Sequence, residues 1–227
     1  MFNFSISSIS LDNLILLFLI TAITVTPLIH YSSSGGTELY PVGYKKFLLI
    51  KEDVVDEPKR DFLLYISLIL LLLVFYKIRY RNNFFSWDKS YLPLFIFIFL
   101  LFISSLFSSY PFIAIYGKPH RCNGLLTYFC YILLFLLYSN FINSPKRLKE
   151  VIYALLGSSF LISLYGLFQF FGINFIFDLK SVSRAYSTLG NPNFAGSYII
   201  MLLSLVLVLY IREKKIKKLY LFGFLAI

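Results

Sequence analysis

Six long apolar runs recur along the 227-residue chain, and polar or charged segments separate each run from the next. A helix needs about 20 predominantly apolar residues to cross the ~30 Å hydrocarbon core of a bilayer, and so each run predicts a transmembrane helix. The predicted spans lie near residues 14–29, 62–76, 92–107, 124–141, 151–171 and 194–211. A seventh apolar run covers residues 219–227.

Composition excludes a water-soluble domain. Hydrophobic residues make up 59% of the chain and charged residues 14%, and the mean hydropathy is +0.78. We therefore expect one all-α domain over residues 1–227, a polytopic helical bundle in the cell (plasma) membrane. Because the run 219–227 is too short to cross a bilayer, we also expect the chain to be the N-terminal part of a longer protein.

The surplus of basic residues predicts which way the bundle faces. Lys and Arg number 21 against 11 Asp and Glu, and they gather in alternate connections, which is typical of cytoplasmic loops. These basic connections lie at residues 77–89, 146–149 and 212–218, and the last also suits anionic lipid head groups. The N-terminus is therefore expected in the cytoplasm and the connection 31–61 outside. Since the charge is spread between apolar runs, no nucleic-acid partner is expected.

Cysteine and histidine are too few for a metal or disulfide framework. The chain has two cysteines, Cys122 and Cys130, and two histidines. This content favours incidental thiols near the start of a helix, and we expect no metal site and no cofactor.

One outer connection places three cationic or titratable residues just before the fourth predicted span. Lys118, His120 and Arg121 precede Gly124, where the helix should begin. The unpaired N–H groups and the dipole of a helix N-terminus favour a bound anion. The alternative is a solvated loop whose arginine reaches toward lipid phosphate.

A second outer segment, residues 184–197, predicts a well-defined helix start. Asn191 is a good N-cap, Pro192 suits the first helical position, and Asn193 follows. Arg184 lies a few residues upstream, within reach of a phosphate held at that helix end. The alternative is that these residues only cap the helix.

The fifth predicted span carries small residues on one face. Ser159, Ser163 and Gly166 fall at helical spacing, which lets another helix approach closely. Gln169 extends this face toward the outer surface, and a buried amide there would need hydrogen-bond partners.

Three segments of the chain resemble the O-antigen ligase/polymerase superfamily. The first is a Gly…Arg…Gly-Leu-Leu-Thr-Tyr segment, the second reads Tyr-Gly-Leu-Phe-Gln, and the third is an arginine followed by Gly-Asn-Pro-Asn. They stand in the family's order at residues 117–128, 165–169 and 184–197.

The resemblance implies a metal-independent membrane glycosyltransferase of the GT-C-like helical class. Its donor would be a polyprenyl-diphosphate-linked glycan, and its acceptor a glycan, lipid or protein on the outer face. By the same resemblance, the residues that bind the donor diphosphate would be Arg121 and Arg184, with Asn191 and Asn193 shaping the helix end. We expect Lys118, His120 and Gln169 to be auxiliary residues of the same diphosphate-binding site.

The resemblance assigns no catalytic base. In the family, a large outer loop in the second half of the protein supplies the histidine and further arginines that activate the acceptor, and residues 1–227 contain no such loop. This part alone is therefore expected to be inactive. Two other functions stay open: a transporter or flippase subunit, and a non-catalytic membrane partner in cell-surface polysaccharide assembly. The transferase hypothesis predicts that Arg121, Arg184 and Asn191 cluster around a cavity open to lipid.

Overall fold

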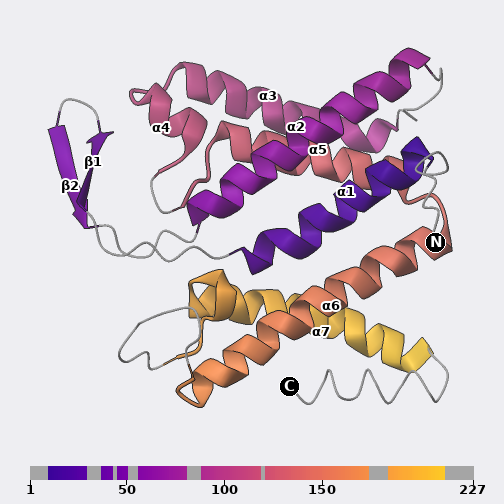
Figure 1. The fold of residues 1–227 in the computed structure, drawn as a ribbon. Helices are drawn as coiled ribbons and strands as arrows, with labels where there is room; N and C mark the ends of the chain where they lie inside the picture. Colours follow the sequence, from indigo (N-terminus) through magenta and orange to yellow (C-terminus); the bar gives the residue numbers. More distant parts are fainter. Residues whose placement is uncertain are drawn as a thin grey trace, which may run out of the picture.

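The structure is a computed structural model that describes residues 10–29, 37–42, 45–50, 56–80, 88–118, 121–173 and 184–212. Helices form most of this part of the chain and lie roughly alongside one another (Figure 1). The helices are α1 (Leu11–Val25), η2 (Thr26–Leu28), α2 (Asp56–Tyr80), η3 (Lys89–Tyr91), α3 (Leu92–Leu106), α4 (Pro111–Tyr116), α5 (Leu125–Phe141), α6 (Pro145–Phe170), η4 (Ser187–Leu189) and α7 (Pro192–Arg212).

The expected membrane bundle is confirmed in its coarse form. Within the described ranges, five helices are long and apolar enough to cross a membrane. The sixth, α5, has 17 residues, which gives a length of about 26 Å at 1.5 Å per residue. Each of the six longer predicted spans coincides with one of these helices, and the run 219–227 lies outside the described residues.

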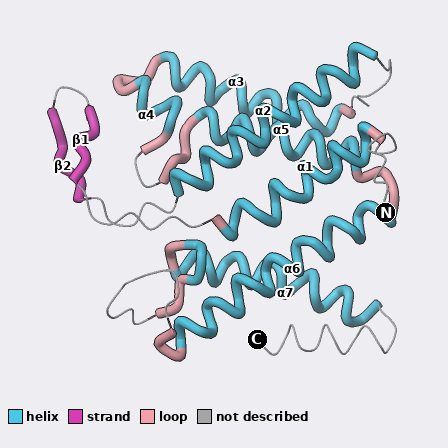
Figure 2. Tube along the Cα trace, viewed as in Figure 1, coloured by secondary structure: helices cyan, strands magenta, loops and turns pink. Residues whose placement is uncertain are grey.

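A two-stranded antiparallel hairpin departs from the all-α expectation. Strands β1 (Thr37–Val42) and β2 (Lys45–Ile50) pair from Thr37 opposite Ile50 to Val42 opposite Lys45. The hairpin lies to one side of the helices (Figure 2). It belongs to the connection 31–61, which hydropathy identified only as polar, because a short hairpin leaves no long apolar run.

Two helices are longer than the apolar runs predicted. Helix α2 starts at Asp56 and not near residue 62, because a charged turn with Asp56 and Glu57 precedes the apolar segment and suits the positive helix end. Helix α6 starts at Pro145, where the Ser144 side chain caps the helix by accepting a hydrogen bond from the Arg147 N–H at 3.3 Å.

A hydrophobic core lies where α1, α2 and α5 pack together. Ile15 and Leu19 of α1, Leu70 of α2 and Phe141 of α5 are fully buried in it. Many apolar side chains on the other faces, such as Phe75 and Ile200, are exposed. An apolar exterior of this extent is typical of a surface that contacts lipid.

The helix ends fall into two groups. One end of the bundle, here called the Asp56 end, is formed by Leu28, Asp56, Leu125, Phe170 and Pro192 (Figure 1). At the opposite end, the Lys77 Nζ lies 2.6 Å from an Asp12 carboxylate oxygen and 4.7 Å from the centre of the Phe141 ring. These contacts tie α1, α2 and α5 together where α1 begins.

The small-residue face of α6 lies against protein. Ser159 is 2% exposed, and a Cβ added to Gly166 would lie 3.7 Å from the Ser187 Cβ. The expected close approach therefore occurs, although at Gly166 the neighbour is the short helix η4 and not a long helix.

Replacing Leu70 by Ala tests the core. Leu70 is 0% exposed, while Leu72 on the same helix is 59% exposed. Leu70→Ala leaves a cavity among α1, α2 and α5, and we expect it to destabilise the fold by on the order of 2 kcal/mol, whereas Leu72→Ala changes little. Thermal unfolding in detergent measures both variants, and equal losses of stability would contradict the packing described here.

Candidate anion site

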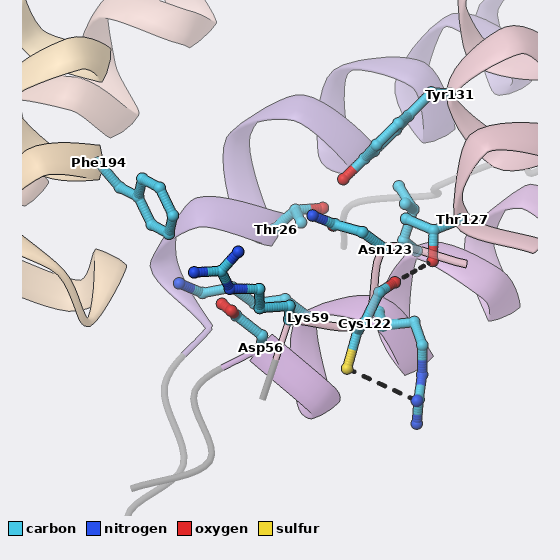
Figure 3. Close-up of a pocket in the computed structure, with 11 residues that line it drawn as sticks. Thr26, Asp56, Lys59, Cys122, Asn123, Thr127, Tyr131 and Phe194 are labelled. Atoms are coloured by element: carbon cyan, nitrogen blue, oxygen red, sulfur yellow. Dashed lines mark hydrogen bonds between the residues drawn. The ribbon is translucent and has the colours of Figure 1, made fainter. Parts of the chain in front are cut away.

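A cavity of about 490 Å³ opens at the Asp56 end, between the end of α1 and the starts of α2, α5 and α7 (Figure 3). Three basic side chains and one carboxylate contribute to its lining, together with neutral polar and aromatic groups. The lining residues are Thr26, Asp56, Lys59, Arg60, Leu63, Arg121, Cys122, Asn123, Thr127, Tyr131 and Phe194.

The loop before α5 is shaped by two glycines whose backbones touch. Gly117 has a φ of 90°, and a Cβ at Gly124 would lie 2.3 Å from the Gly117 nitrogen. At both positions a side chain would collide with backbone, and glycine avoids this collision. The fold brings the two ends of the loop together and leaves Arg121 and Asn123 on the cavity wall.

Hydrogen bonds hold the same loop on the start of α5. The Lys118 carbonyl accepts from the N–H groups of Arg121 and Cys122, at 3.1 and 2.9 Å. The Thr127 hydroxyl donates to the Cys122 carbonyl at 2.6 Å. Cys122 itself has a φ of 49°, a left-handed conformation that is uncommon outside glycine and asparagine.

The first turns of α2 supply a second wall of the cavity. Asp56, Lys59, Arg60 and Leu63 fall at helical spacing on one face. The Arg60 guanidinium donates to an Asp61 oxygen at 2.9 Å and to the Cys122 sulfur at 3.6 Å. These contacts fix the orientation of Arg60 and join α2 to the loop before α5.

Lys59 joins α2 to the segment before α7. Its Nζ donates to the Thr188 carbonyl at 2.8 Å, and the Thr188 hydroxyl donates to the Pro27 carbonyl at 2.8 Å. Thr188 is 5% exposed. The two hydrogen bonds connect the ends of α1 and α2 with η4, and so they hold the walls of the cavity in place.

Cys122 is a protonated thiol at neutral pH. Burial raises the pKa of the Cys122 thiol to about 11, although the positive charge of Arg60 acts in the opposite direction. A thiol of this kind is a poor nucleophile, because the thiolate is the reactive form. Both cysteines are buried and free of disulfide bonds. That the two cysteines are incidental thiols stays a prediction. Cys122 lines the cavity.

The loop residues singled out from sequence lie at different places relative to the cavity. Arg121 is exposed and lines it. Lys118 is exposed and contributes its carbonyl to the loop. His120 lies outside the described residues. Arg184 is exposed and is not among the lining residues.

The Asn-Pro-Asn segment forms the expected helix start. The Asn191 side chain accepts from the Asn193 N–H at 2.8 Å, and the Asn191 carbonyl accepts from the Ala195 N–H at 3.0 Å. These bonds pair two N–H groups in the first turn of α7, and the bond to the Asn191 side chain is the capping bond. The role of Asn191 and Asn193 at the donor diphosphate stays a prediction. Neither residue lines the cavity.

Gln169 is a positioning residue for the segment that follows Arg184. Its Oε1 accepts from the N–H groups of Tyr186 and Ser187, at 3.2 and 2.7 Å. Ser187 has a φ of 51°, and the two bonds from Gln169 stabilise that strained turn. The Gln169 Oε1 therefore faces protein, whereas its buried Nε2 has no hydrogen-bond partner among the described residues. The auxiliary role of Gln169 stays a prediction.

Sequence reasoning missed the contribution of α2. Asp56, Lys59 and Arg60 belong to the connection 31–61, whose charges served only to assign the side of the membrane. Their helical spacing continues the face of Leu63, and this continuity is the signal that could have identified them. Among the described residues, no group of three or more His, Cys, Asp or Glu side chains could hold a metal ion.

Alkylation tests the protonation state of Cys122. In a Cys130→Ser background, the low thiolate fraction should make Cys122 react about 100-fold more slowly at pH 7–8 than a free cysteine. The rate should rise steadily with pH toward about 11, because deprotonation supplies the nucleophile. A rate that reaches its plateau below pH 9 would show an ordinary thiol.

The glycine contact predicts a strong difference between two Gly→Ala variants. Gly124→Ala forces backbone atoms apart, and we expect a loss of about 1–3 kcal/mol and a distorted cavity loop. Gly157→Ala is the control, because an added Cβ there meets nothing within 4 Å and alanine favours a helix by about 1 kcal/mol. Thermal unfolding in detergent measures both, and equal midpoints would contradict the loop geometry.

Comparisons with known proteins do not assign the chain to a family. No protein-family model, no curated protein and no solved structure matches it. A functional interpretation therefore depends on the residues and geometry of the cavity.

Proposed function

We propose that this chain binds a polyprenyl-diphosphate-linked glycan and belongs to a membrane glycosyltransferase of the O-antigen ligase/polymerase kind. The observation that carries the proposal is the cavity at the Asp56 end, where Lys59, Arg60 and Arg121 line one space at the end of an apolar bundle. Such a site suits a ligand with a long apolar chain and an anionic head group.

The charge of the cavity supports a diphosphate. Three basic side chains and the Asp56 carboxylate contribute to the lining, which leaves an excess of positive charge. Each phosphate of a diphosphate diester keeps one negative charge. Guanidinium groups bind phosphate oxygens bidentately, and a lysine adds a compact charge. Arg60 is paired with the Asp61 carboxylate, whereas Lys59 donates one hydrogen bond to the neutral Thr188 carbonyl. We therefore assign the main phosphate contacts to Arg121 and Lys59.

Helix polarity supports the same ligand. Helices α2, α5 and α7 all begin at the Asp56 end, and Lys59, Thr127 and Phe194 from their first turns line the cavity. The N-terminal end of a helix carries partial positive charge. Three such ends beside one cavity add to the attraction of the basic side chains for an anion.

The distribution of charge supports an outward-facing cavity. The opposite end of the bundle carries Lys77, Arg79, Lys146, Arg147 and Lys149 without a matching number of acidic residues in the same loops. Under the positive-inside rule that end is cytoplasmic. The proposed site then faces the outer side of the cell membrane, with the N-terminus in the cytoplasm.

In the proposed reaction, the acceptor hydroxyl loses its proton to a base that the described residues do not assign. Its oxygen forms a bond to the anomeric carbon while the bond from that carbon to the diphosphate breaks. Arg121 and Lys59 stabilise the charge that develops on the leaving diphosphate. Arg184 keeps its proposed role as a second donor contact, because it lies four residues before Thr188, the residue that Lys59 binds. The acceptor is a glycan, lipid or protein.

Donor binding tests the proposal directly, and it needs no assigned catalytic base. The protein in lipid nanodiscs is titrated with fluorescent polyprenyl diphosphate. Arg121→Ala should weaken binding by about 10–100-fold, as expected for loss of a charge-assisted hydrogen bond. Arg79→Ala is the matched control, because Arg79 is an exposed arginine at the other end of α2.

Two outcomes would contradict the proposal. Equal affinities of wild type, Arg121→Ala and Arg79→Ala would remove the anion site from the cavity. Transport of the lipid between the leaflets of reconstituted vesicles, with no transfer of its glycan, would replace the transferase by a flippase.

A further inference from the structure

Part of the cavity wall is unsuited to phosphate. We infer that Asp56 and Asn123 bind the first sugar of the lipid-linked donor, so that the cavity selects a glycosylated diphosphate over the bare lipid diphosphate. This inference rests on the proposed function and names the part of the donor that these two residues recognise.

The size of the cavity leaves room beyond a diphosphate. Its volume is about 490 Å³, and pockets of about 300–1,000 Å³ bury most of a drug-sized ligand. A diphosphate is much smaller than such a ligand. A diphosphate together with a sugar ring matches the space better than a diphosphate alone.

The chemistry of Asp56 and Asn123 fits hydroxyl groups. An ionised carboxylate only accepts hydrogen bonds, and at close range it repels phosphate. An amide both donates and accepts, and a sugar hydroxyl also does both. The negative charge of Asp56 favours the charged form of Lys59. Asp56 is therefore in part a counter-ion of Lys59. A counter-ion of Lys59 could also lie away from the cavity. Asp56 and Asn123 both line the cavity, where they can contact a ligand.

Their positions also fit the order of groups in the donor. Asp56 is one helical turn before Lys59, and Asn123 is two residues after Arg121. The hydroxyls of the first sugar lie directly beside the phosphate to which the sugar is linked. Side chains that contact those hydroxyls must therefore lie beside the phosphate-binding cations, as these two do.

Aromatic rings complete a surface for a sugar. Phe194 of α7 and Tyr131 of α5 line the cavity from different sides, and Asn123 lies between them in the view of Figure 3. An aromatic ring offers an apolar face to the C–H side of a sugar, while the polar groups fix its orientation.

The test compares two probes on the same protein in nanodiscs: polyprenyl diphosphate and the same lipid carrying a single N-acetylhexosamine or hexose. A site built to hydrogen-bond hydroxyls discriminates strongly against a ligand that lacks them. Wild type should therefore bind the better of the glycosylated probes about tenfold or more tightly than the bare lipid. Asp56→Ala and Asn123→Ala should each bring this ratio close to one while the bare lipid still binds.

Glu57→Ala is the matched control, because it removes a carboxylate from the neighbouring position, which does not line the cavity. It should keep the wild-type ratio. Thermal unfolding of each variant identifies any that fails to fold, and Asn123→Ala then carries the test without a change of charge.

The outcomes separate this inference from the proposed function. Equal binding of bare and glycosylated lipid by wild type would overturn the inference and leave the diphosphate site intact. An equal loss of both ligands in Asp56→Ala and Asn123→Ala would also overturn it, since the two residues would then support the fold or the phosphate. If wild type binds neither probe, the proposed function fails.

Discussion

Backbone hydrogen bonding in a hydrocarbon environment constrains this structure more than any other factor. Within a bilayer an unpaired N–H or C=O group costs several kcal/mol, and a helix satisfies these groups within its own segment. The long apolar helices follow from that requirement. It also leaves irregular backbone and charged side chains at the helix ends, and so the cavity lies at one end of the bundle.

The cavity depends on a few contacts that hold helix ends together. Lys59 and Thr188 connect α2 with the segment before α7 and with the end of α1. Arg60 connects α2 with Cys122, in the loop whose ends meet at Gly117 and Gly124. Segments that lie far apart in sequence are thus fixed around one space. An arrangement held before the ligand arrives lowers the entropic cost of binding.

Hydropathy predicted the long helices well, because an apolar run can be identified from neighbouring residues without knowledge of distant contacts. Sequence placed Arg121 just before the helix start at Gly124, and in the structure Arg121 lines the cavity. Its contact with a diphosphate stays a prediction. Arg184 was expected beside it, but it is not among the lining residues. The segment after it is held by Gln169 of α6 and by the Pro27 carbonyl of η2. Lys59 and Asp56 were missed, because their helical turn precedes the apolar run. The hydrogen bond of Lys59 also joins residues 129 positions apart.

The account of function depends on where a lipid diphosphate binds. A structure of the protein in a nanodisc with polyprenyl diphosphate tests this most directly. The account predicts both phosphates in the cavity at the Asp56 end, within hydrogen-bond distance of Arg121 and Lys59. Phosphates bound at the Lys77 end, or beside the bundle with the cavity holding only water, would contradict it.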